Sequence, residues 1–341
     1  MMIKTAVVIL NWNGLPWLKR FLGDVIRFSN DDETKVFVAD NCSNDGSVEW
    51  LARNFPETEL IRFDTNLGFA GGYNAALNQI NAKYFVLLNS DVEVTENWLK
   101  PLISFMDQNP DVASCQPKIR SLANRDFFEY AGAAGGYIDK YGYAFCRGRI
   151  FDNVEKDTGQ YDDAVDIFWS TGACMVVRAA AWSKCGGFDE DFFAHMEEID
   201  LCWRFHLSGL RVVFVPGSVV YHAGGGALPY GSELKTYLNF RNSLYLLYKN
   251  LPDEKLKSVL FKRRILDGIA AIRFFFKGHE NLRAIRKAHR DFSRAVKFLK
   301  PKRSVVKKLT ITQPRYGILN KSIVFRFYFL NEKIFSNLKF Q

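Results

Sequence analysis

Three carboxylates lie close together in a segment that is otherwise rich in aromatic side chains. Glu197, Glu198 and Asp200 follow two phenylalanines and precede Trp203. Burying an ionised carboxylate beside aromatic rings is costly unless another group pairs with it or the chemistry of a site uses it. The segment therefore supplies three candidate acid–base groups.

Two other groups that can do chemistry end apolar runs elsewhere in the chain. Asp91 closes the run that begins at Leu87, and His222 follows residues 219–221. A carboxylate, a second cluster of acids and an imidazole, each at the edge of a strand or helix, predict a metal-assisted transfer site. Plainer roles stay open, because an aspartate often closes a turn and a histidine beside a glycine-rich loop is often only hydrogen-bonded.

The elements that must position these groups alternate along the first 110 residues. Apolar runs predict strands at 6–10, 36–39, 59–63 and 84–88, and amphipathic runs predict helices at 16–28, 47–54 and 69–81. This alternation predicts an α/β fold with a Rossmann-like, mostly parallel sheet that helices flank. Ligands bind such sheets at the carboxyl ends of the strands. Polar or small residues gather there: Asn11, Asn13, Asp40, Asn41, Asp64, Asn66, Gly68 and Asp91.

The remaining chain is expected to be less regular and to end in a separate part. Residues 111–170 predict loops and short antiparallel strands. A strand at 172–178, a helix at 198–208, strands at 210–215 and 218–221, and a helix at 232–249 are expected after them. We expect residues 1–250 to form a catalytic domain and residues 251–341 a basic, mainly helical C-terminal extension.

The two parts differ in charge. The 341 residues include 46 Lys and Arg and 37 Asp and Glu, which gives a net charge of +9. Residues 251–341 carry 23 of the cations and six of the acids, whereas residues 1–250 carry 23 and 31. A basic extension favours an anionic partner. Nucleic acid is not expected, because no recognition motif accompanies the charge.

Within the extension, residues 281–303 combine cations with apolar residues at helical spacing. This pattern suits a helix on an anionic membrane surface. The alternative is a solvated helix packed against the catalytic domain. The apolar residues concerned are Leu282, Ile285, Phe292, Val296 and Leu299.

No segment predicts export or a membrane span. The apolar run near the N-terminus is too short for a signal peptide, and no uncharged stretch reaches the ~18 residues of a transmembrane helix. Six scattered cysteines without a CxxC pair suggest reduced, mostly buried thiols. We expect a cytoplasmic location, at the inner face of the cell membrane if the basic extension binds lipid.

Five motifs occur in the order that is found in the family 2 glycosyltransferases of the GT-A fold. They are VVILNWNG, VADNCSNDGS, NLGFAGGYN, LLNSDVEV and GGFDEDFFAHMEEIDLCWR. The chain resembles most closely the bacterial rhamnosyltransferase-like and galactofuranosyltransferase-like members. The resemblance implies inverting transfer of a sugar from a UDP- or dTDP-linked donor to a hydroxyl of a glycan or lipid-linked acceptor, in cell-surface polysaccharide synthesis.

The same resemblance implies a donor site at the strand ends. Asp40 would accept the imide N–H of uracil or thymine, which donates one proton between two carbonyls; a turn or helix cap is the alternative. Gly68 opens a helix whose N-terminus favours anions. The other implied donor-site residues are Asn11, Asn13, Asn41, Asn66, Asn74 and Asn89.

A divalent cation, Mn²⁺ or Mg²⁺, would by the same resemblance be held by Asp91 and His222 against the leaving diphosphate. Only the last position of Asn89-Ser90-Asp91 keeps a carboxylate of the family's acidic motif. Asn89 would then hydrogen-bond the ribose or a metal-bound water.

Glu198 stands where the family usually has the aspartate that acts as general base. Glutamate is one methylene longer, so the reach changes while the chemistry is kept. Glu197 and Asp200 are the alternative bases, and they also fit acids stabilised by the dipole of a helix N-terminus. Asp200 is expected to contact Arg204, four residues later on the same helix face.

Trp169 and Asp189 would complete the floor of the site by the same resemblance, with Arg204 beside them. The ring would stack on sugar C–H faces and the carboxylate would bind hydroxyls. A single tryptophan is, however, more often part of a core.

Two rival functions are weighed against a transferase. A nucleotidyltransferase also uses a metal and a similar sheet, but it gives the last of the five motifs no purpose. A non-catalytic glycan- or membrane-binding protein with a decayed site is favoured by the replacements at Asn89 and Glu198.

Overall fold

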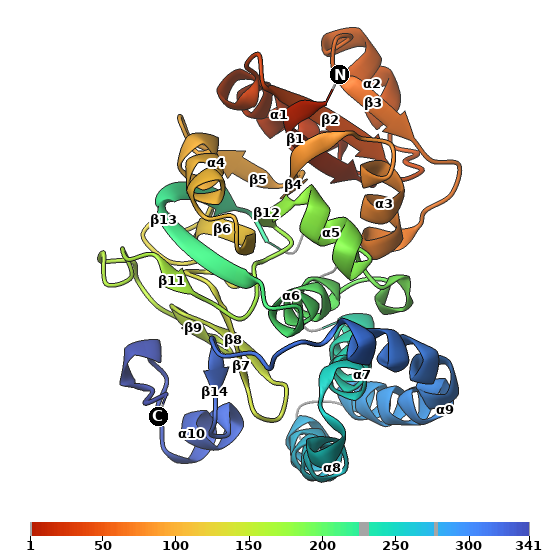
Figure 1. The fold of residues 1–341 in the computed structure, drawn as a ribbon, viewed down its shortest axis with the longest axis vertical. Coiled ribbons are helices and arrows are strands. Elements are labelled where there is room, and N and C mark those ends of the chain that lie inside the picture. The colour runs from red at the N-terminus through yellow and green to blue at the C-terminus, as the bar shows by residue number, and fades with distance from the viewer. Residues whose placement is uncertain (1, 225–231, 276–278, 341) are drawn as a thin grey trace.

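The computed structural model describes residues 2–224, 232–275 and 279–340, and a nine-stranded sheet forms its centre (Figure 1). The strand order is β11-β13-β6-β12-β4-β1-β2-β3, and β5 pairs with β13. Four strands of the N-terminal half are mutually parallel, as expected: β1 (Ile3–Asn11), β2 (Thr34–Asp40), β3 (Glu59–Arg62) and β4 (Ala82–Asn89).

The helices between these strands also lie where the sequence predicts them. They are α1 (Leu15–Ser29), α2 (Ser47–Asn54) and α3 (Gly68–Leu77), and α4 (Leu99–Gln108) follows β4. In α1 the buried residues Leu18, Phe21, Leu22 and Val25 recur at the spacing of one helix face, and a proline lies in the first turn. The fold class is therefore confirmed.

The prediction for residues 111–170 is wrong at its start, because β6 (Val112–Ser121) is a long strand inside the main sheet. It pairs in parallel with β13 (Arg211–His222), a single strand where two were expected. The register shifts between Val215 and Val219, opposite Pro117. The unpaired residues of β13 at this bulge include Pro216, which has no N–H for the ladder, and a bulge is the expected response to such a proline.

Three short strands complete the main sheet beside β6 and β13. They are β5 (Val92–Val94), β11 (Val165–Asp166) and β12 (Cys174–Arg178), and each is antiparallel to its neighbours. The antiparallel β12 joins the two parallel sets, so that β4 and β6 approach each other. Val92 of β5 pairs with His222 of β13, and this places Asp91, which lies between β4 and β5, beside His222.

A second sheet joins the C-terminal extension to the rest of the chain. Its order is β10 (Asn153–Val154), β9 (Arg149–Ile150), β8 (Ala144–Cys146), β7 (Gly136–Asp139) and β14 (Ile318–Leu319). Because β14 pairs in parallel with β7, residues far beyond the proposed boundary at 250 belong to this sheet. The division into residues 1–250 and 251–341 stays a proposal.

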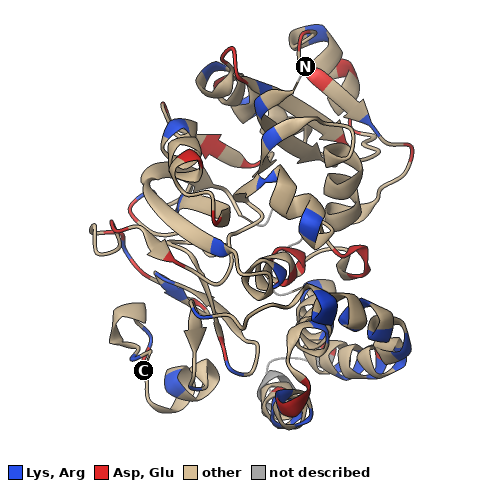
Figure 2. Ribbon diagram, in the orientation of Figure 1, with Lys and Arg blue, Asp and Glu red and all other residues tan. Residues whose placement is uncertain are grey.

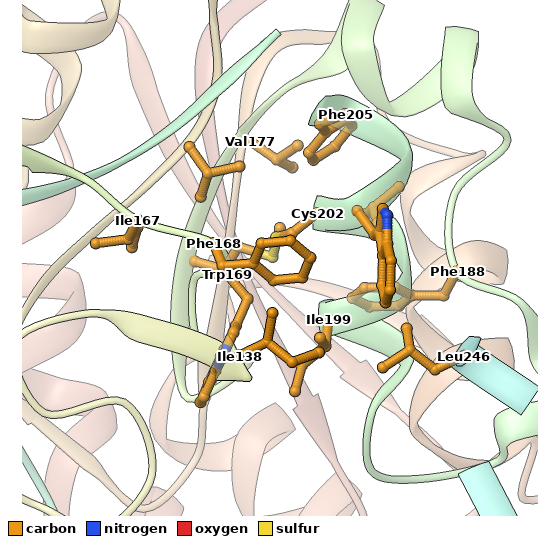
Figure 3. Packing of buried hydrophobic residues seen from close by; sticks show 14 of the residues in the cluster. Ile138, Ile167, Phe168, Trp169, Val177, Phe188, Ile199, Cys202, Phe205 and Leu246 are labelled. Atoms are coloured by element: carbon orange, nitrogen blue, oxygen red, sulfur yellow. The ribbon is translucent and has the colours of Figure 1, made fainter. Parts of the chain in front are cut away.

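Helices α7 (Glu233–Asn250), α8 (Asp253–Phe275) and α9 (His279–Leu309) pack together, whereas α10 (Ile323–Phe329) lies apart from them near β14 (Figure 1). The other helical elements of the second half are α5 (Ala179–Cys185), the 3-10 turn η1 (Glu190–Phe192), α6 (Glu197–Leu207) and the 3-10 turn η2 (Phe335–Asn337). Figure 3 shows Ile199, Cys202 and Phe205 of α6 in a hydrophobic cluster that also contains Phe168 and Leu246.

Helix α9 packs its apolar face on the protein. Ile285, Phe292 and Leu299 are buried, and the Phe292 ring meets those of Tyr245 and Tyr248 of α7. Leu282 and Val296 are half-buried. The alternative of a helix packed against the catalytic domain is therefore what the structure shows, and this face is not available to a membrane. Figure 2 shows lysines and arginines along α8 and α9; most of those described are exposed, whereas Arg263 and Arg303 are buried.

In the described ranges, no helix is both long enough and apolar enough to span a membrane. Five of the six cysteines are buried free thiols, and Cys42 is exposed.

Candidate active site

Asn11 and Asp40 meet at the carboxyl ends of β1 and β2. Asn11 Nδ2 donates to Asp40 Oδ2 at 3.1 Å and to Ser43 Oγ at 3.1 Å. The Ser43 N–H donates to Asp40 Oδ1 at 3.0 Å. Both side chains are buried. A carboxylate has lone pairs for more than two donors, so Asp40 caps this loop and still has capacity to accept a further hydrogen bond.

Asn41 holds the turn that precedes α3. Its Nδ2 donates to Asn66 Oδ1 and to Gly68 O, both at 3.0 Å, and its Oδ1 accepts from the Leu67 N–H at 2.9 Å. Asn66 Oδ1 also accepts from the Gly68 N–H at 2.8 Å. These three residues are brought together, but their side-chain groups are mostly used in shaping the backbone.

Gly68 allows this turn to touch the segment that carries the acids. Its φ is +71°, and a Cβ there would lie 2.7 Å from the Phe193 ring. The Phe69 N–H donates to Phe193 O at 3.0 Å. The beginning of α3 and the loop before Glu197 are thus one contact surface, and only glycine fits at this position.

Two other asparagines expected at the donor site serve neighbouring loops. Asn13 has φ 51°, and its Oδ1 accepts from the Asn44 N–H at 2.8 Å. Asn74 donates to Phe188 O at 2.9 Å and accepts from the Phe188 N–H at 3.0 Å. Asn74 therefore ties α3 to the loop after α5 with both ends of its amide. Asn89 is half-buried at the end of β4.

Asp91 and His222 are adjacent. His222 Nε2 lies 3.2 Å from Asp91 Oδ1, and the Ala223 N–H donates to Asp91 O at 3.0 Å. Both side chains are buried. A glutamate that the sequence analysis missed, Glu129, places its Oε2 at 3.2 Å from the other ring nitrogen, Nδ1. Burial alone lowers the pKa of His222, but its contacts with Asp91 and Glu129 outweigh burial and raise it to about 10.

The donor set fits a divalent cation in part. Carboxylate oxygen and imidazole nitrogen are ligands for Mn²⁺, and two adjacent ligands at about 2.1 Å from one ion lie ~3 Å apart. The separation of 3.2 Å between Asp91 and His222 matches that spacing. In the described part of the chain, no three His, Cys, Asp or Glu side chains converge as a complete ligand set.

The loop before α6 contains strained backbone, and a side chain of α7 holds it in place. Phe193, His195 and Met196 have φ of 63°, 69° and 75°, values that non-glycine residues rarely adopt. Asn242 Nδ2 lies within 3.0 Å of the carbonyl oxygens of Phe192, Ala194 and His195 and donates to them. Sequence analysis missed Asn242, because one asparagine in an amphipathic helix gives no local signal of this function.

Glu197 and Glu198 begin α6, and each keeps an oxygen without a protein partner. Within the described residues, no hydrogen bond reaches Oε2 of either glutamate, although both atoms are buried. Burial raises the pKa of Glu198 to about 7, although backbone N–H groups at the helix start oppose this. Burial, together with the charge of Glu198, raises the pKa of Glu197 well above its usual range.

Asp200 differs from its two neighbours because its oxygens are fully engaged. Arg204 Nε, Lys249 Nζ and Asn250 Nδ2 donate to it at 3.0, 2.9 and 2.8 Å. The expected contact with Arg204 is present, and Arg204 also donates to Cys185 O and Gly187 O. Both residues are buried, and they fasten α6 to the Gly-Gly turn and to α7.

Asp189 is engaged in the same way. Lys249 Nζ and Lys302 Nζ each lie 2.5 Å from one of its oxygens. Burial alone raises the pKa of Asp189, but the two lysines hold it at about 2.

Trp169 is a core residue: it is 4% exposed, and its Nε1 donates to Tyr137 O at 3.0 Å (Figure 3). The structure thus places Asp189, Asp200, Arg204 and Trp169 in the scaffold around the acids.

The model of the family described as Glycosyl transferase family 2 matches residues 6–168. Over 232 residues the chain is 25% identical to an N-acetylglucosaminyl-diphospho-decaprenol L-rhamnosyltransferase of Mycobacterium tuberculosis, covering 63% of this chain and 75% of that protein. It is 23% identical to the rhamnosyltransferase WbbL of Escherichia coli, covering 63% and 82%.

Solved structures share the fold. The chain is similar to TarS 1-349 of S. aureus, with a TM-score of 0.55 and 16% identity, over 90% of this chain and 87% of that one. It is also similar to GalNAc-T7 with UDP, GalNAc and Mn²⁺, with a TM-score of 0.56 and 16% identity, over 73% and 48%. The chain therefore carries a family 2 glycosyltransferase domain, matched over residues 6–168, and the rhamnosyltransferase relatives and the shared architecture support a glycosyltransferase of the GT-A fold.

Proposed function

We propose that this glycosyltransferase is metal-dependent and inverting, and that it moves a hexose or deoxyhexose from a UDP- or dTDP-linked donor to a hydroxyl of a glycan or lipid-linked acceptor. In such a displacement the acceptor oxygen bonds to the anomeric carbon as the bond to the diphosphate breaks. The acceptor hydroxyl loses its proton to a base in the same step. Attack from the face opposite the leaving group inverts the configuration at that carbon.

The state of Glu198 carries this proposal. A general base must hold a free lone pair and a pKa near the working pH. Glu198 has an oxygen without a partner among the described residues and a pKa of about 7. Asp189 and Asp200 are bound by lysine and arginine side chains instead. Glu198 is therefore the base in this proposal, and Glu197 remains its protonated neighbour.

Asp91 and His222 are the proposed protein ligands of a Mn²⁺ or Mg²⁺ ion. When bound, the ion neutralises charge that grows on the leaving diphosphate. Two protein ligands leave room for diphosphate oxygens, as in other sites where substrate phosphates complete the shell of a hard cation. GalNAc-T7, which shares the fold, was solved with UDP and Mn²⁺, and this supports proposing a divalent cation here.

Asp40 is the proposed reader of the pyrimidine. It is buried at the end of β2 and keeps acceptor capacity beside Asn11. In this proposal the turn formed by Asn41, Asn66 and Gly68 contacts the nucleotide-sugar donor through backbone atoms rather than side chains. Asn13, Asn74 and Asn89 support the adjoining loops in this proposal.

The names of the relatives indicate the setting. Both rhamnosyltransferase relatives favour a deoxyhexose donor, and the mycobacterial relative is named for a lipid-diphosphate-linked acceptor. We propose polysaccharide assembly at the inner face of the membrane as the setting. The exposed cations of α8 and α9 would supply the attraction to anionic lipid, without insertion of the buried face of α9.

A binding measurement tests the donor site first. Thermal shift with UDP, dTDP, GDP and CMP, each with and without Mn²⁺, measures stabilisation by ligands of the folded state. A ligand at a hundredfold excess over its Kd stabilises by about 2.7 kcal/mol. We expect a metal-dependent shift with UDP or dTDP. No shift with any nucleotide would refute the donor-site assignment.

A further inference from the structure

Glu129 lies on the far side of His222 from Asp91. It is 5% exposed, and its Oε2 lies 3.2 Å from His222 Nδ1 in an ion-pair contact without hydrogen-bond geometry, whereas Asp91 Oδ1 is hydrogen-bonded to Nε2 at 3.2 Å. The two ring nitrogens of an imidazole point in different directions, so these carboxylates cannot both be ligands of one ion that the histidine binds. Since Asp91 is the proposed co-ligand at Nε2, Glu129 would contact the imidazole of His222 rather than the cation.

The position of Glu129 is fixed by the strand that also holds His222. The Glu129 N–H donates to Ile119 O of β6 at 3.0 Å, and the Ala131 N–H donates to the Glu129 carboxylate. The Leu122 N–H, just after β6, donates to His222 O at 3.0 Å. One strand end thus sets the distance between the carboxylate and the imidazole.

We propose that Glu129 is a positioning residue that keeps the proton of His222 on Nδ1 and leaves the Nε2 lone pair for the cation. A histidine that binds a metal through one nitrogen usually donates its other N–H to a carboxylate or carbonyl, and that partner sets the ring orientation and the tautomer. The assignment rests on the proposed metal dependence. Glu129 lies within residues 111–170, where no sequence motif indicates a role in the site.

The variants Glu129→Gln and Glu129→Leu test this role. Gln keeps an acceptor oxygen of similar reach, whereas Leu removes it. Mn²⁺ affinity is measured by electron paramagnetic resonance in the presence of saturating UDP or dTDP, whichever shifts the wild-type melting temperature. Loss of the outer carboxylate typically costs 10–100-fold in metal affinity. We expect that loss for Leu and a smaller one for Gln.

A matched control separates positioning from folding. Glu155→Gln changes a glutamate in the neighbouring segment that binds Tyr161 and the Phe335 N–H and does not contact His222. It is expected to keep wild-type Mn²⁺ affinity. Nitrogen-15 spectra of histidine-labelled protein with Zn²⁺, a diamagnetic probe, are expected to show one metal-bound and one protonated ring nitrogen for His222, and this pattern should be lost in Glu129→Leu.

Three results would overturn the assignment. Unchanged Mn²⁺ affinity in Glu129→Leu, with a lowered melting temperature, would make Glu129 a purely structural partner. An Nε2-protonated, Nδ1-bound histidine in the wild type would reverse the roles of the two carboxylates. A wild-type chain that binds nucleotide but no Mn²⁺ would refute the metal proposal itself, and the donor site would stand.

Discussion

Lys302 Nζ, on the C-terminal helix α9, lies 2.5 Å from Oδ1 of Asp189, in the loop that leads to the acids of α6. It also pairs with Asp191 at 2.6 Å. On the other side of Asp189, Lys249 Nζ joins that carboxylate to Asp200. Lys302 of the C-terminal extension therefore directly supports the loop that precedes Glu197 and Glu198, although the two segments are more than a hundred residues apart in the sequence.

Replacing Lys302 tests that support. In Lys302→Met the loop keeps its contact with Lys249 and loses the one from α9. Because Lys302 is partly exposed, we expect a loss of about 1 kcal/mol in the free energy of unfolding. We also expect a fall in kcat with little change in donor KM, since the base is less well held. Urea denaturation and steady-state kinetics measure both. Lys300→Met, an exposed lysine of the same helix, is the control; equal effects in the two variants would remove the specific role of Lys302.

Burial of the α9 face makes a second prediction. Phe292 is 5% exposed and Phe298, on the same helix, is 65% exposed. Truncating a buried phenylalanine costs about 3–5 kcal/mol, whereas a surface change is usually within about 0.5 kcal/mol. Phe292→Ala should therefore unfold at much lower urea than Phe298→Ala. If Phe292→Ala instead kept its stability and lost binding to anionic vesicles, the helix would lie on the membrane.

Much of the N-terminal half can be predicted from sequence because its signals are local. Strands β1, β2 and β4 are continuous apolar runs, and α1 shows one apolar face with a proline in its first turn. The polar residues at the strand ends then follow from the geometry of parallel sheets.

The strand β6 lacks such a signal. It contains Pro117 and a buried lysine, Lys118, whose charge is neutralised by Asp157 at 2.9 Å and by Asp162. Neither partner is near in sequence, and the strand that pairs with β6 in parallel, β13, lies about ninety residues later in the chain. Non-local pairing of this kind overrides local propensity.

The same limit applies to the site. The position of Asp91 and His222 beside each other depends on β13 crossing to β5 and β6, and Glu129 and Asn242 come from segments without a motif. Asp189, Asp200 and Arg204 have the residue types of an active site, but Lys249 pairs with both aspartates and Arg204 pairs with Asp200, so their charges are engaged within the fold. A sequence shows which groups can do chemistry, and the fold decides which of them are left free.

A third prediction concerns Asp40. Asp40→Ala removes the proposed acceptor for the pyrimidine imide and also a partner of Asn11 and Ser43. We expect weaker UDP or dTDP binding, by about 10-fold or more for a lost charge-assisted hydrogen bond. Isothermal titration with the nucleotide measures it. Asp45→Ala is the control, because Asp45 caps the same loop through Leu15 and Ser47. If both variants lose stability equally and neither loses affinity, Asp40 is only a cap.

A fourth prediction follows from the raised pKa of Glu198. A base acts when it has lost its proton, so kcat/KM should rise with pH and level off above about 7. Glu198→Gln should lower kcat by about 10²–10⁴-fold, and Glu198→Asp should keep part of the activity because the carboxylate remains. Matching loss in Glu197→Gln with an active Glu198→Gln would assign the base to Glu197 instead.

The free energy of unfolding should change with pH in the opposite direction to kcat/KM. Between its ordinary pKa of about 4.3 and the folded value of about 7, Glu198 binds more proton in the folded than in the unfolded chain. The free energy of unfolding therefore falls as pH rises through that window. Gln cannot ionise, so Glu198→Gln should match the wild type near pH 4 and exceed it above pH 7, by on the order of 1–3 kcal/mol. Urea denaturation across this range measures the difference. A variant that is less stable than the wild type at about pH 8 would mean that the ionised carboxylate is stabilised in the fold and is a structural group rather than the base.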